Sequence, residues 1–512
     1  MKRYVLASTL AAFCFSASAQ TPINLITFVA PQPAQSPPGE FLESWSAGFN
    51  TASLSSGISS LRLNLPDGAV ETVDLVYFEP RHGYLAVDLD GDGDTEDVID
   101  PNASPEEISW RWYGRSSNWT VALTLESGVL AGRISGPDHR YGIKPGRNGT
   151  TLLGLVNSEH WQLHSGDTDE DAHQLVSSIA EPDKKNDELS SKSVAVPMAW
   201  DTTCAAPLEP GVRVVDLLIL YTSGVVDSSG GTSAGARAAI QSSMDDVSQS
   251  LRNTGISRLK FALRGIEAAD TLVSYDTLSL SDALRAFGGW EDLPAPDYIG
   301  FPGNSHVLAR RNANEADIVA LARAADDGTC GVSLIQHKTL SGYLREPGAG
   351  FEKFAYLVFN PNCNADRLNL AHELGHLFGM EHDPKNATSV LAATRSCPWS
   401  HGHRRTSTIP GDPLRFRTVM SYWQNGSASG GPGGCGSSTG CPLIDAYSST
   451  AYEWNGASIL PVGTSTSALM IGVPYPAAPN WAAKADDTLV RLAKIVEQFR
   501  TSSEIIFLDN FQ

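Results

Sequence analysis

The sequence predicts an α/β domain with a twisted, mostly parallel sheet, preceded by a β-rich unit. Two observations support this prediction: short alternating segments in the first third of the chain, and helical patterns between buried strands from about residue 211 onward. A chain of 512 residues is also longer than one ordinary domain, so we expect two folded units with a connecting segment.

The first residues have the pattern of a secretory signal peptide. Lys2 and Arg3 precede a short apolar run over residues 4–15, and Ala17 and Ala19 fit a small-residue cleavage site. This run is too short to cross a membrane, and no later apolar stretch is long enough to do so. We therefore expect residues 1–19 to be removed and the protein to be secreted, by way of the periplasm, without a membrane span.

Residues 20–165 are predicted to form the β-rich unit. Apolar and polar residues alternate over 59–65, 119–125 and 129–134, and Gly and Pro separate these segments at short intervals. From about residue 166 to 210, Asp, Glu, Lys and Ser dominate, which is typical of an exposed linker. Such a linker is a natural place for proteolytic processing.

Residues 211–502 carry the α/β pattern, and residues 503–512 form a short tail. Strands are expected where apolar residues run almost without interruption: 214–221, 259–263, 316–321 and 354–359. Two helices are marked by apolar residues three or four positions apart, the first ended by Gly255: Ala236, Ile240, Met244, Val247 and Leu251, then Leu489, Leu492, Val496 and Phe499. Helices between strands favour a mostly parallel sheet.

The net charge argues against one class of partner. The chain has 57 acidic and 37 basic residues, a formal charge of −20, and no block of Lys and Arg. Binding to nucleic acid needs clustered cations that neutralise phosphates, so we expect no nucleic-acid partner. The composition is that of an acidic exported protein, which we expect to be a monomer.

The strongest chemical signal is the segment from His372 to His382. His372 and His376 are four residues apart, which on a helix places both imidazoles on one face and within reach of one ion. Gly379 can adopt a positive φ, end the helix and redirect the chain so that His382 reaches the same ion. Glu373 is next to the first ligand, where its carboxylate can reach a metal-bound water.

Three imidazoles predict a catalytic zinc site, because they leave a fourth position open, whereas a structural zinc site is closed by a fourth protein ligand. Zinc in such a site lowers the pKa of its bound water and polarises a substrate carbonyl. Glu373 would be the general base, which takes the water proton and passes it to the leaving amine.

The run HELGHLFGMEHD, residues 372–383, resembles the metzincin metallopeptidases, and Asp383 resembles their reprolysin (adamalysin-like) branch. Metzincins carry a Met-turn downstream, and residues 418–422 fit it. The resemblance implies that Met420 forms a hydrophobic floor beneath the metal; an ordinary core methionine is the alternative. Tyr422 stands where astacins and serralysins place a tyrosine that ligates zinc or stabilises the oxyanion, although a buried structural tyrosine is also open.

The resemblance covers roughly residues 212–500 and implies a secreted zinc endopeptidase that acts on proteins or peptides. Residues 108–114 and 141–143 also resemble the propeptides of such bacterial enzymes. They imply a zymogen whose own prodomain inhibits the enzyme or assists its folding. The competing hypothesis is a protein that uses a metzincin fold for binding or adhesion, without turnover.

Six cysteines follow the signal peptide: Cys204, Cys330, Cys363, Cys397, Cys435 and Cys441. An even number in an exported chain predicts disulfides. Cys435 and Cys441 could close a local loop, and Cys330 with Cys363 is the next candidate pair. Cys204 has two possible roles. Its thiolate could hold zinc in a latent form of the enzyme, or it could form a disulfide with Cys397.

The acidic segment with Asp88, Asp90, Asp92 and Asp94 resembles the start of a calcium-binding loop. Oxygens at positions one, three and five, with Gly at position six, suit calcium. Position twelve is Ile99 instead of Glu, so an acidic hairpin turn is the alternative. A calcium-binding N-terminal half would stay attached as a permanent module.

Overall fold

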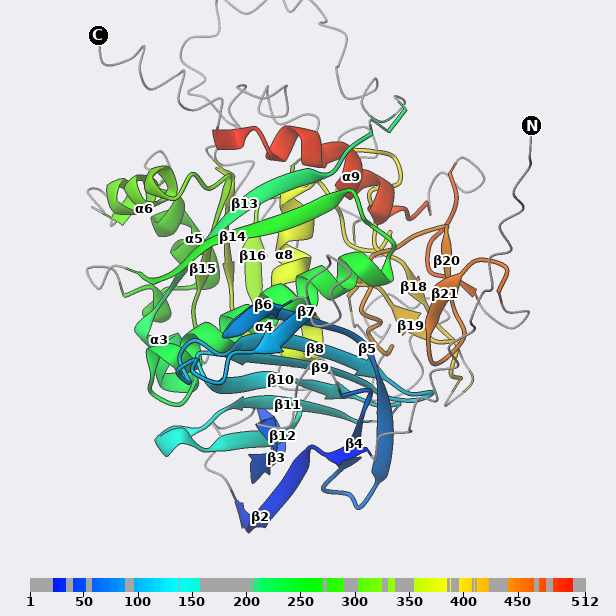
Figure 1. The fold of residues 1–512 in the computed structure, drawn as a ribbon. Helices are drawn as coiled ribbons and strands as arrows, with labels where there is room; N and C mark the ends of the chain where they lie inside the picture. The colour runs from blue at the N-terminus through cyan, green and yellow to red at the C-terminus, as the bar shows by residue number, and fades with distance from the viewer. Residues whose placement is uncertain are drawn as a thin grey trace, which may run out of the picture.

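In the computed structural model, the long helix α4 (Ser233–Asn253) lies between two β-sheets, one from each half of the chain (Figure 1). The mixed α/β class expected from the sequence is confirmed. The structure describes the following residues: 22–33, 40–51, 58–87, 96–137, 139–156, 204, 207–208, 210–269, 274–289, 303–324, 330–336, 354–384, 387, 396–407, 409, 412–422, 441–464, 469–475 and 482–500.

The N-terminal sheet has ten strands in the order β1-β4-β5-β8-β9-β10-β11-β12-β3-β2, and all its neighbours are antiparallel except β1 and β4. Its strands are β1 (Ile23–Asn24), β2 (Ile26–Pro33), β3 (Phe41–Phe49), β4 (Ser60–Asn64), β5 (Val70–His82), β8 (Ser109–Arg115), β9 (Thr120–Glu126), β10 (Val129–Ser135), β11 (Arg140–Pro145) and β12 (Thr151–Val156).

Strand β8 is buried on both faces, and the alternation of its side chains explains why. Trp110 and Trp112 point to one face, opposite Leu125 and Leu123 of β9, and form part of the sheet's own apolar core. Arg111 on the other face is buried as well. The buried Arg111 is paired with Glu79 of the neighbouring strand β5 and lies 3.6 Å from Asp245 of α4.

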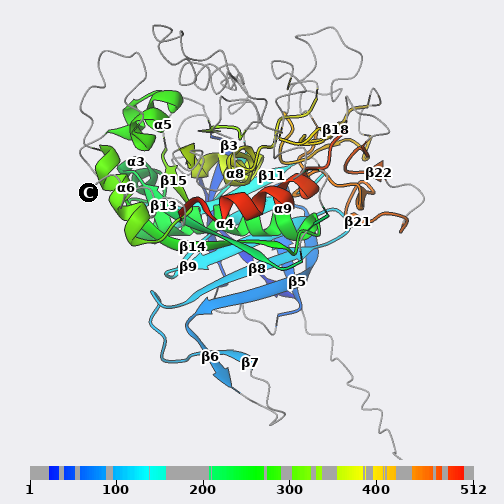
Figure 2. The same cartoon turned by 90° about the horizontal axis from the view of Figure 1, so that it is seen from above.

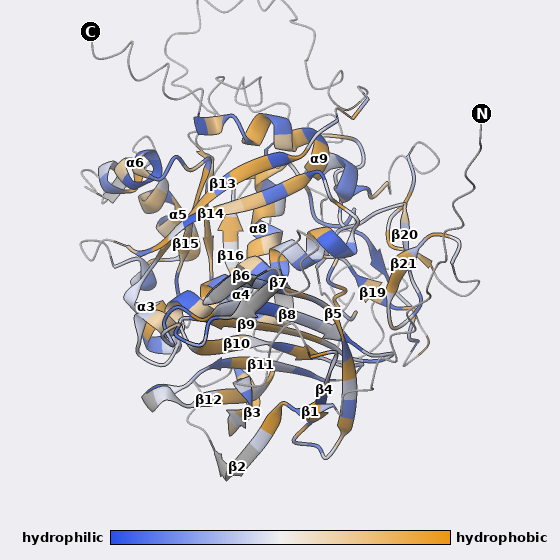
Figure 3. Cartoon of the chain, in the orientation of Figure 1, coloured by the Kyte–Doolittle hydropathy of each residue, from blue (hydrophilic) through white to orange (hydrophobic). Residues whose placement is uncertain are grey.

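The second sheet has five strands in the order β14-β13-β15-β17-β16. The first four are parallel to their neighbours, and the edge strand β16 runs antiparallel to β17. Their bounds are β13 (Arg213–Tyr221), β14 (Leu259–Ala268), β15 (Ile318–Ala322), β16 (Gly331–Ser333) and β17 (Tyr356–Phe359). Figure 3 shows hydrophobic residues along β13, β15 and helix α8 (Asn369–Leu377), which lie in the interior.

The remaining helices and strands connect these layers or cover them. The helices are η2 (Arg147–Gly149), α3 (Ser223–Ser228), η4 (Tyr275–Thr277), α5 (Leu280–Gly288), α6 (Gly303–Ala313), η6 (Pro361–Cys363), α7 (Asn364–Arg367) and α9 (Ala485–Val496). The small strands are β6 (Tyr84–Val87), β7 (Glu96–Ile99), β18 (Arg404–Arg405), β19 (Phe416–Arg417), β20 (Tyr452–Trp454), β21 (Ile459–Pro461) and β22 (Leu469–Met470). The hairpin of β6 and β7 projects from the rest of the molecule (Figure 2).

The strands and helices expected from hydrophobic periodicity are present, with shifted ends. The apolar stripe from Ala236 to Leu251 lies on α4, which ends at Asn253. Gly255 follows two residues later with φ +72°, and a β-carbon there would meet the Tyr452 ring. The edge strand β16 was not expected, because three residues show no periodicity.

Several predicted features lie outside the described residues. They are the signal peptide, most of the linker over 166–210, and the tail over 503–512. None of the helices seen in the described ranges has the length and apolar character that a membrane span requires.

One buried carboxyl group gives the second sheet a pH dependence. Asp317 precedes β15, accepts the backbone N–H of Asp216 at 3.0 Å and that of Arg500 at 3.2 Å, and is 3% exposed. Burial raises the pKa of Asp317 from 3.8 to about 6, although both hydrogen bonds oppose this rise. A raised carboxyl pKa means that the folded protein binds this proton more tightly than the unfolded chain. The stabilising contribution is complete below the unfolded pKa and is lost as the pH rises through about 6.

We predict that Asp317→Asn removes this pH dependence. The stability of the unmodified protein relative to the variant should increase when the pH falls from 7 to 5, because only the unmodified protein gains a proton at this position. The urea midpoint of unfolding, measured for both proteins at both pH values, checks this. An equal difference at pH 5 and pH 7 would contradict the prediction.

Candidate metal centre

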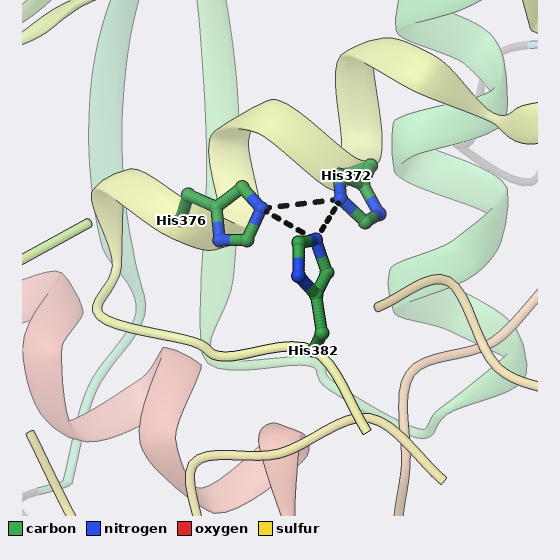
Figure 4. Close-up of side chains that lie close together, drawn as sticks. All are labelled: His372, His376 and His382. Carbon is green, nitrogen blue, oxygen red and sulfur yellow. Dashed lines mark hydrogen bonds between the residues drawn. The ribbon is translucent and has the colours of Figure 1, made fainter. Parts of the chain in front are cut away.

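Helix α8 and the turn after it bring three imidazoles together (Figure 4). His372 and His376 lie one helical turn apart on α8, and His382 comes from the following segment. The Nε2 atoms are 3.0 Å apart for His372 and His382, 3.1 Å for His372 and His376, and 3.2 Å for His376 and His382. A tetrahedral zinc ion with bonds of about 2.0–2.1 Å separates its ligand atoms by about 3.3 Å, so this triangle fits zinc.

The main chain sets the protonation of two of these rings. The Nδ1 atom of His372 lies 2.8 Å from the carbonyl oxygen of Val419, and that of His376 lies 2.7 Å from the carbonyl oxygen of Met380. A carbonyl can only accept, so each Nδ1 carries the hydrogen and each Nε2 of these neutral imidazoles presents a lone pair. Lone pairs that converge in this way are favourable around a cation, which supports a metal at the centre.

Gly379 reverses the chain after the helix. Its φ is +73°, its N–H donates to the carbonyl of His376 at 2.8 Å, and Met380 N–H donates to the carbonyl of Gly375 at 3.0 Å. These two bonds close the end of α8. A β-carbon on Gly379 would collide with the side chain of Ser396 and lie 2.8 Å from the carbonyl oxygen of Gln336. Glycine is therefore required both by φ and by space.

Glu373 lies on α8 between the triad and the edge strand β16. It is 3% exposed, and the Ser333 hydroxyl lies 3.0 Å from its Oε2 atom and 2.9 Å from its main-chain oxygen. A β-carbon on Gly331 would come within 2.7 Å of Oε1, so β16 contacts this carboxylate through a residue without a side chain. Nothing in the spacing of the sequence predicts the contact with Ser333, because it joins residues 40 positions apart.

Met420 and Tyr422 both contact residues of the metal centre or its helix. Met420 is fully buried in a turn after β19, and its thioether occupies the space where a β-carbon on Gly375 would project. The Tyr422 ring lies on the His382 ring with centroids 3.8 Å apart. The structure thus places Met420 against helix α8 and Tyr422 beside the third histidine.

Asp383 connects the ligand segment to the Met420 turn. Its Oδ2 accepts the backbone N–H of Tyr422 at 3.3 Å, and its Oδ1 lies 3.4 Å from Arg404. Asp383 is buried, so the ion pair with Arg404 compensates its charge. The sequence does not predict that Arg404 pairs with Asp383, because this contact depends on the pairing of β18 with β19.

His401 and His403 lie next to the segment that carries the third histidine. His401 forms a β-bridge with Glu381, and its Nδ1 lies 2.8 Å from the carbonyl oxygen of His382. Burial lowers the pKa of His403 to about 4, although Asp383 opposes this shift. His403 is therefore neutral near pH 7. Nothing in the sequence indicates that His401 contacts the segment that carries His382.

Cys204 is not available to zinc, and the latent-form thiolate is wrong for this arrangement. Its sulfur forms a disulfide with Cys397, which was the other interpretation. A sulfur in a disulfide has no thiolate to offer a metal. The expected pair of Cys330 and Cys363 is confirmed.

Two other predictions fall outside the described residues. Cys441 is disulfide-bonded, but Cys435 is not described, so that pairing stays a prediction. The four aspartates over residues 88–94 are also outside the described part of the chain. Nothing in the structure supports calcium there.

The comparisons with known proteins agree with this centre. The family model Reprolysin_5, described as metallo-peptidase family M12, matches residues 211–429. No curated protein matches the chain.

Two solved structures show a weak likeness. One, titled "Structure of a chaperone-substrate complex", is 15% identical with a TM-score of 0.35, and the alignment covers 57% of this chain and 40% of that one. The other, metalloproteinase-II from Bacteroides fragilis, is 12% identical with a TM-score of 0.26, covering 66% of this chain and 86% of that one. Since the histidine triad and its turn lie inside the matched range, residues 211–429 belong to the reprolysin-like metallopeptidases of family M12, within the metzincins.

Proposed function

We propose that the chain is a secreted zinc-dependent endopeptidase that hydrolyses peptide bonds in proteins, with Glu373 as general base. The observation that carries this proposal is the buried Glu373 carboxylate on the same helix as two of three converging imidazoles. A protein that only binds partners on this fold needs no buried carboxylate next to its metal ligands.

The residues of the site have separate tasks in this proposal. His372, His376 and His382 would hold zinc, which when bound polarises the scissile carbonyl and acidifies water. Glu373 takes a proton from the attacking water and passes it to the leaving amine. The Ser333 hydroxyl orients the carboxylate, because it lies within hydrogen-bond distance of Oε2.

Tyr422 would assist by donating its hydroxyl hydrogen to the developing oxyanion. Its ring packs on His382, which supports a position next to the reacting carbonyl. Met420 shapes the floor of the site and takes no part in proton transfer.

The N-terminal unit would be the prodomain of a zymogen. We propose residues 1–19 as signal peptide, 20–165 as prodomain, 166–210 as linker, 211–502 as catalytic domain and 503–512 as tail. Two separate apolar cores support this division, one drawn from residues 25–153 and the other from residues 215–499. The two described disulfides fit an exported protein.

We predict that Glu373→Ala keeps zinc and loses peptide hydrolysis. Loss of a general base lowers kcat by roughly 10²–10⁴-fold, while the three imidazoles remain. Cleavage of a fluorogenic peptide library, with zinc measured by mass spectrometry, checks both parts. Glu497→Ala, which removes a carboxylate that pairs with Arg213 outside the site, is the matched control. Undiminished hydrolysis by the Glu373 variant would falsify the assignment.

We also predict that removing the metal with a chelator abolishes hydrolysis in the unmodified protein. Zinc added back should restore it, because the ligands are held by α8 and by main-chain hydrogen bonds in its absence. Hydrolysis that persists with no bound metal would contradict a zinc mechanism. A protein that binds zinc and never cleaves any library peptide would favour the binding hypothesis.

Gly379→Ala is predicted to lower zinc affinity. A left-handed φ costs a non-glycine residue about 1–3 kcal/mol, and the new methyl group would also displace Ser396. The matched control is Gly463→Ala, where φ is +86° and no atom lies within 4 Å of the added carbon. Competition for zinc with a chromogenic chelator measures the effect. Equal zinc affinity in the two variants would show that the turn does not position His382.

A further inference from the structure

Helix α4 has two chemically different sides. An apolar stripe that includes Ile240, Met244 and Val247 belongs to the core of the second half. The other side faces β9, β10 and β11 of the N-terminal sheet, as Figure 1 shows. This second side carries charged groups, which is unusual for a helix surface that is covered.

Charged residues along α4 pair with residues of opposite charge in the N-terminal sheet. Arg237, Asp245 and Arg252 are separated by eight and seven residues, so they share one side of the helix. Arg237 lies 3.6 Å from Glu126 and Arg252 lies 3.4 Å from Glu79, so cations at both ends of α4 meet acids of the sheet. These end pairs are exposed in part and contribute little to affinity.

In the middle of the helix the acidic group belongs to α4 and its cationic partners belong to the sheet. Asp245 pairs with Arg81, accepts a hydrogen bond from the Thr124 hydroxyl, and lies 3.6 Å from Arg111. All three partners belong to strands of the N-terminal sheet, namely β5, β8 and β9. Asp245 is 4% exposed, so its solvation depends on these partners.

Arg133 of β10 is the centre of the second buried group. Its Nε donates to Asp246 at 2.9 Å, and its Nη2 donates to Asp445 at 2.7 Å. Arg133 is 3% and Asp246 is 1% exposed. Burial raises the pKa of Asp246 to about 6, although Arg133 opposes the rise. Arg133 therefore favours the charged form of this carboxylate, which also accepts a hydrogen bond from the side-chain amide of Asn364.

Most of the charge in this cluster is compensated across the boundary between the two halves, and Arg111 also pairs with Glu79 of its own sheet. Three guanidinium groups come from the N-terminal sheet, and three carboxylates come from the second half: Arg81, Arg111 and Arg133, then Asp245, Asp246 and Asp445. Among the described residues, the two apolar cores do not merge. The contact between the halves thus includes buried ion pairs, and interfaces between domains of one chain are typically more polar than obligate interfaces.

With residues 1–19 removed as proposed above, no disulfide can link the two halves once the connecting segment is cut. The chain has no cysteine between Cys14 and Cys204, and Cys204 is bonded to Cys397 within the second half. A cut anywhere in residues 157–203 therefore leaves two pieces that only noncovalent contacts can hold together.

We propose that the charged side of α4, together with Asp445, is a docking surface for the chain's own N-terminal sheet, and that the sheet stays bound there after residues 157–203 are cleaved. The affinity comes from these six charges, five of which are buried, and from the hydrogen bond that Arg140 donates to the carbonyl of Leu443 at 2.8 Å. The proposal does not depend on peptidase activity, because none of these groups is a zinc ligand or the proposed base.

The test uses the full chain with a recognition sequence for a specific protease inserted in residues 157–203. The Glu373→Ala background prevents self-digestion. After the cut, size-exclusion chromatography over a series of dilutions measures the Kd of the two pieces. We expect them to elute together at micromolar concentration without denaturant. Separate elution under these conditions overturns the proposal.

Variants of the buried pair test the mechanism of docking. Asp246→Asn and Arg133→Met should each raise the Kd by roughly 30-fold or more, since truncating one partner of a buried charge pair leaves the other unpaired. The double variant should raise it by less than the product of the two single effects. Asp487→Asn, which breaks the pair with Arg491 inside α9, is the matched control and should leave the Kd unchanged.

A folding defect is distinguished from a docking defect in two ways. Near-ultraviolet circular dichroism of each uncut variant reports its tertiary packing. Arg133→Lys keeps the charge but cannot reach both Asp246 and Asp445, so it should weaken docking less than Arg133→Met. Folded variants that dissociate no more readily than the unmodified pieces would exclude the charge cluster as the docking site.

Discussion

The three imidazoles can share one ion because the chain reverses at Gly379, where φ is +73°. Two main-chain hydrogen bonds, donated by Gly379 and Met380, close helix α8, and the missing β-carbon of Gly379 leaves room for Ser396. The carbonyl groups of Val419 and Met380 then orient two of the rings. The turn therefore sets the position of His382, and the main chain around it sets the tautomers on which a neutral donor set depends.

A second layer of contacts holds this turn from outside. The disulfide of Cys204 and Cys397 ties the start of the second half to the segment that carries Ser396 and leads to His401. His401 in turn contacts the carbonyl of His382. The cysteine considered as a zinc ligand thus acts on the metal centre indirectly, by fixing the segment that packs against the ligand turn.

The N-terminal sheet is joined to the second half by charge instead of by a shared apolar core. Arg133 lies between Asp246 and Asp445, and all three residues are buried. Burying ions is costly unless each is paired, so such a contact favours one specific arrangement over many loose ones. It also leaves both surfaces able to be hydrated when apart, which a shared apolar core would not.

The sequence by itself determined the mixed α/β class, the periodic elements and the spacing of the metal ligands. These features are local: His372 and His376 share a face because a helix turns every 3.6 residues, and Gly379 is adjacent to the helix it ends. Only the tertiary structure decided the partner of Cys204, the contact of Ser333 with Glu373, and the burial of Asp246 against Arg133. Each of these joins residues far apart in the chain, and no local periodicity records which distant segment a side chain will meet.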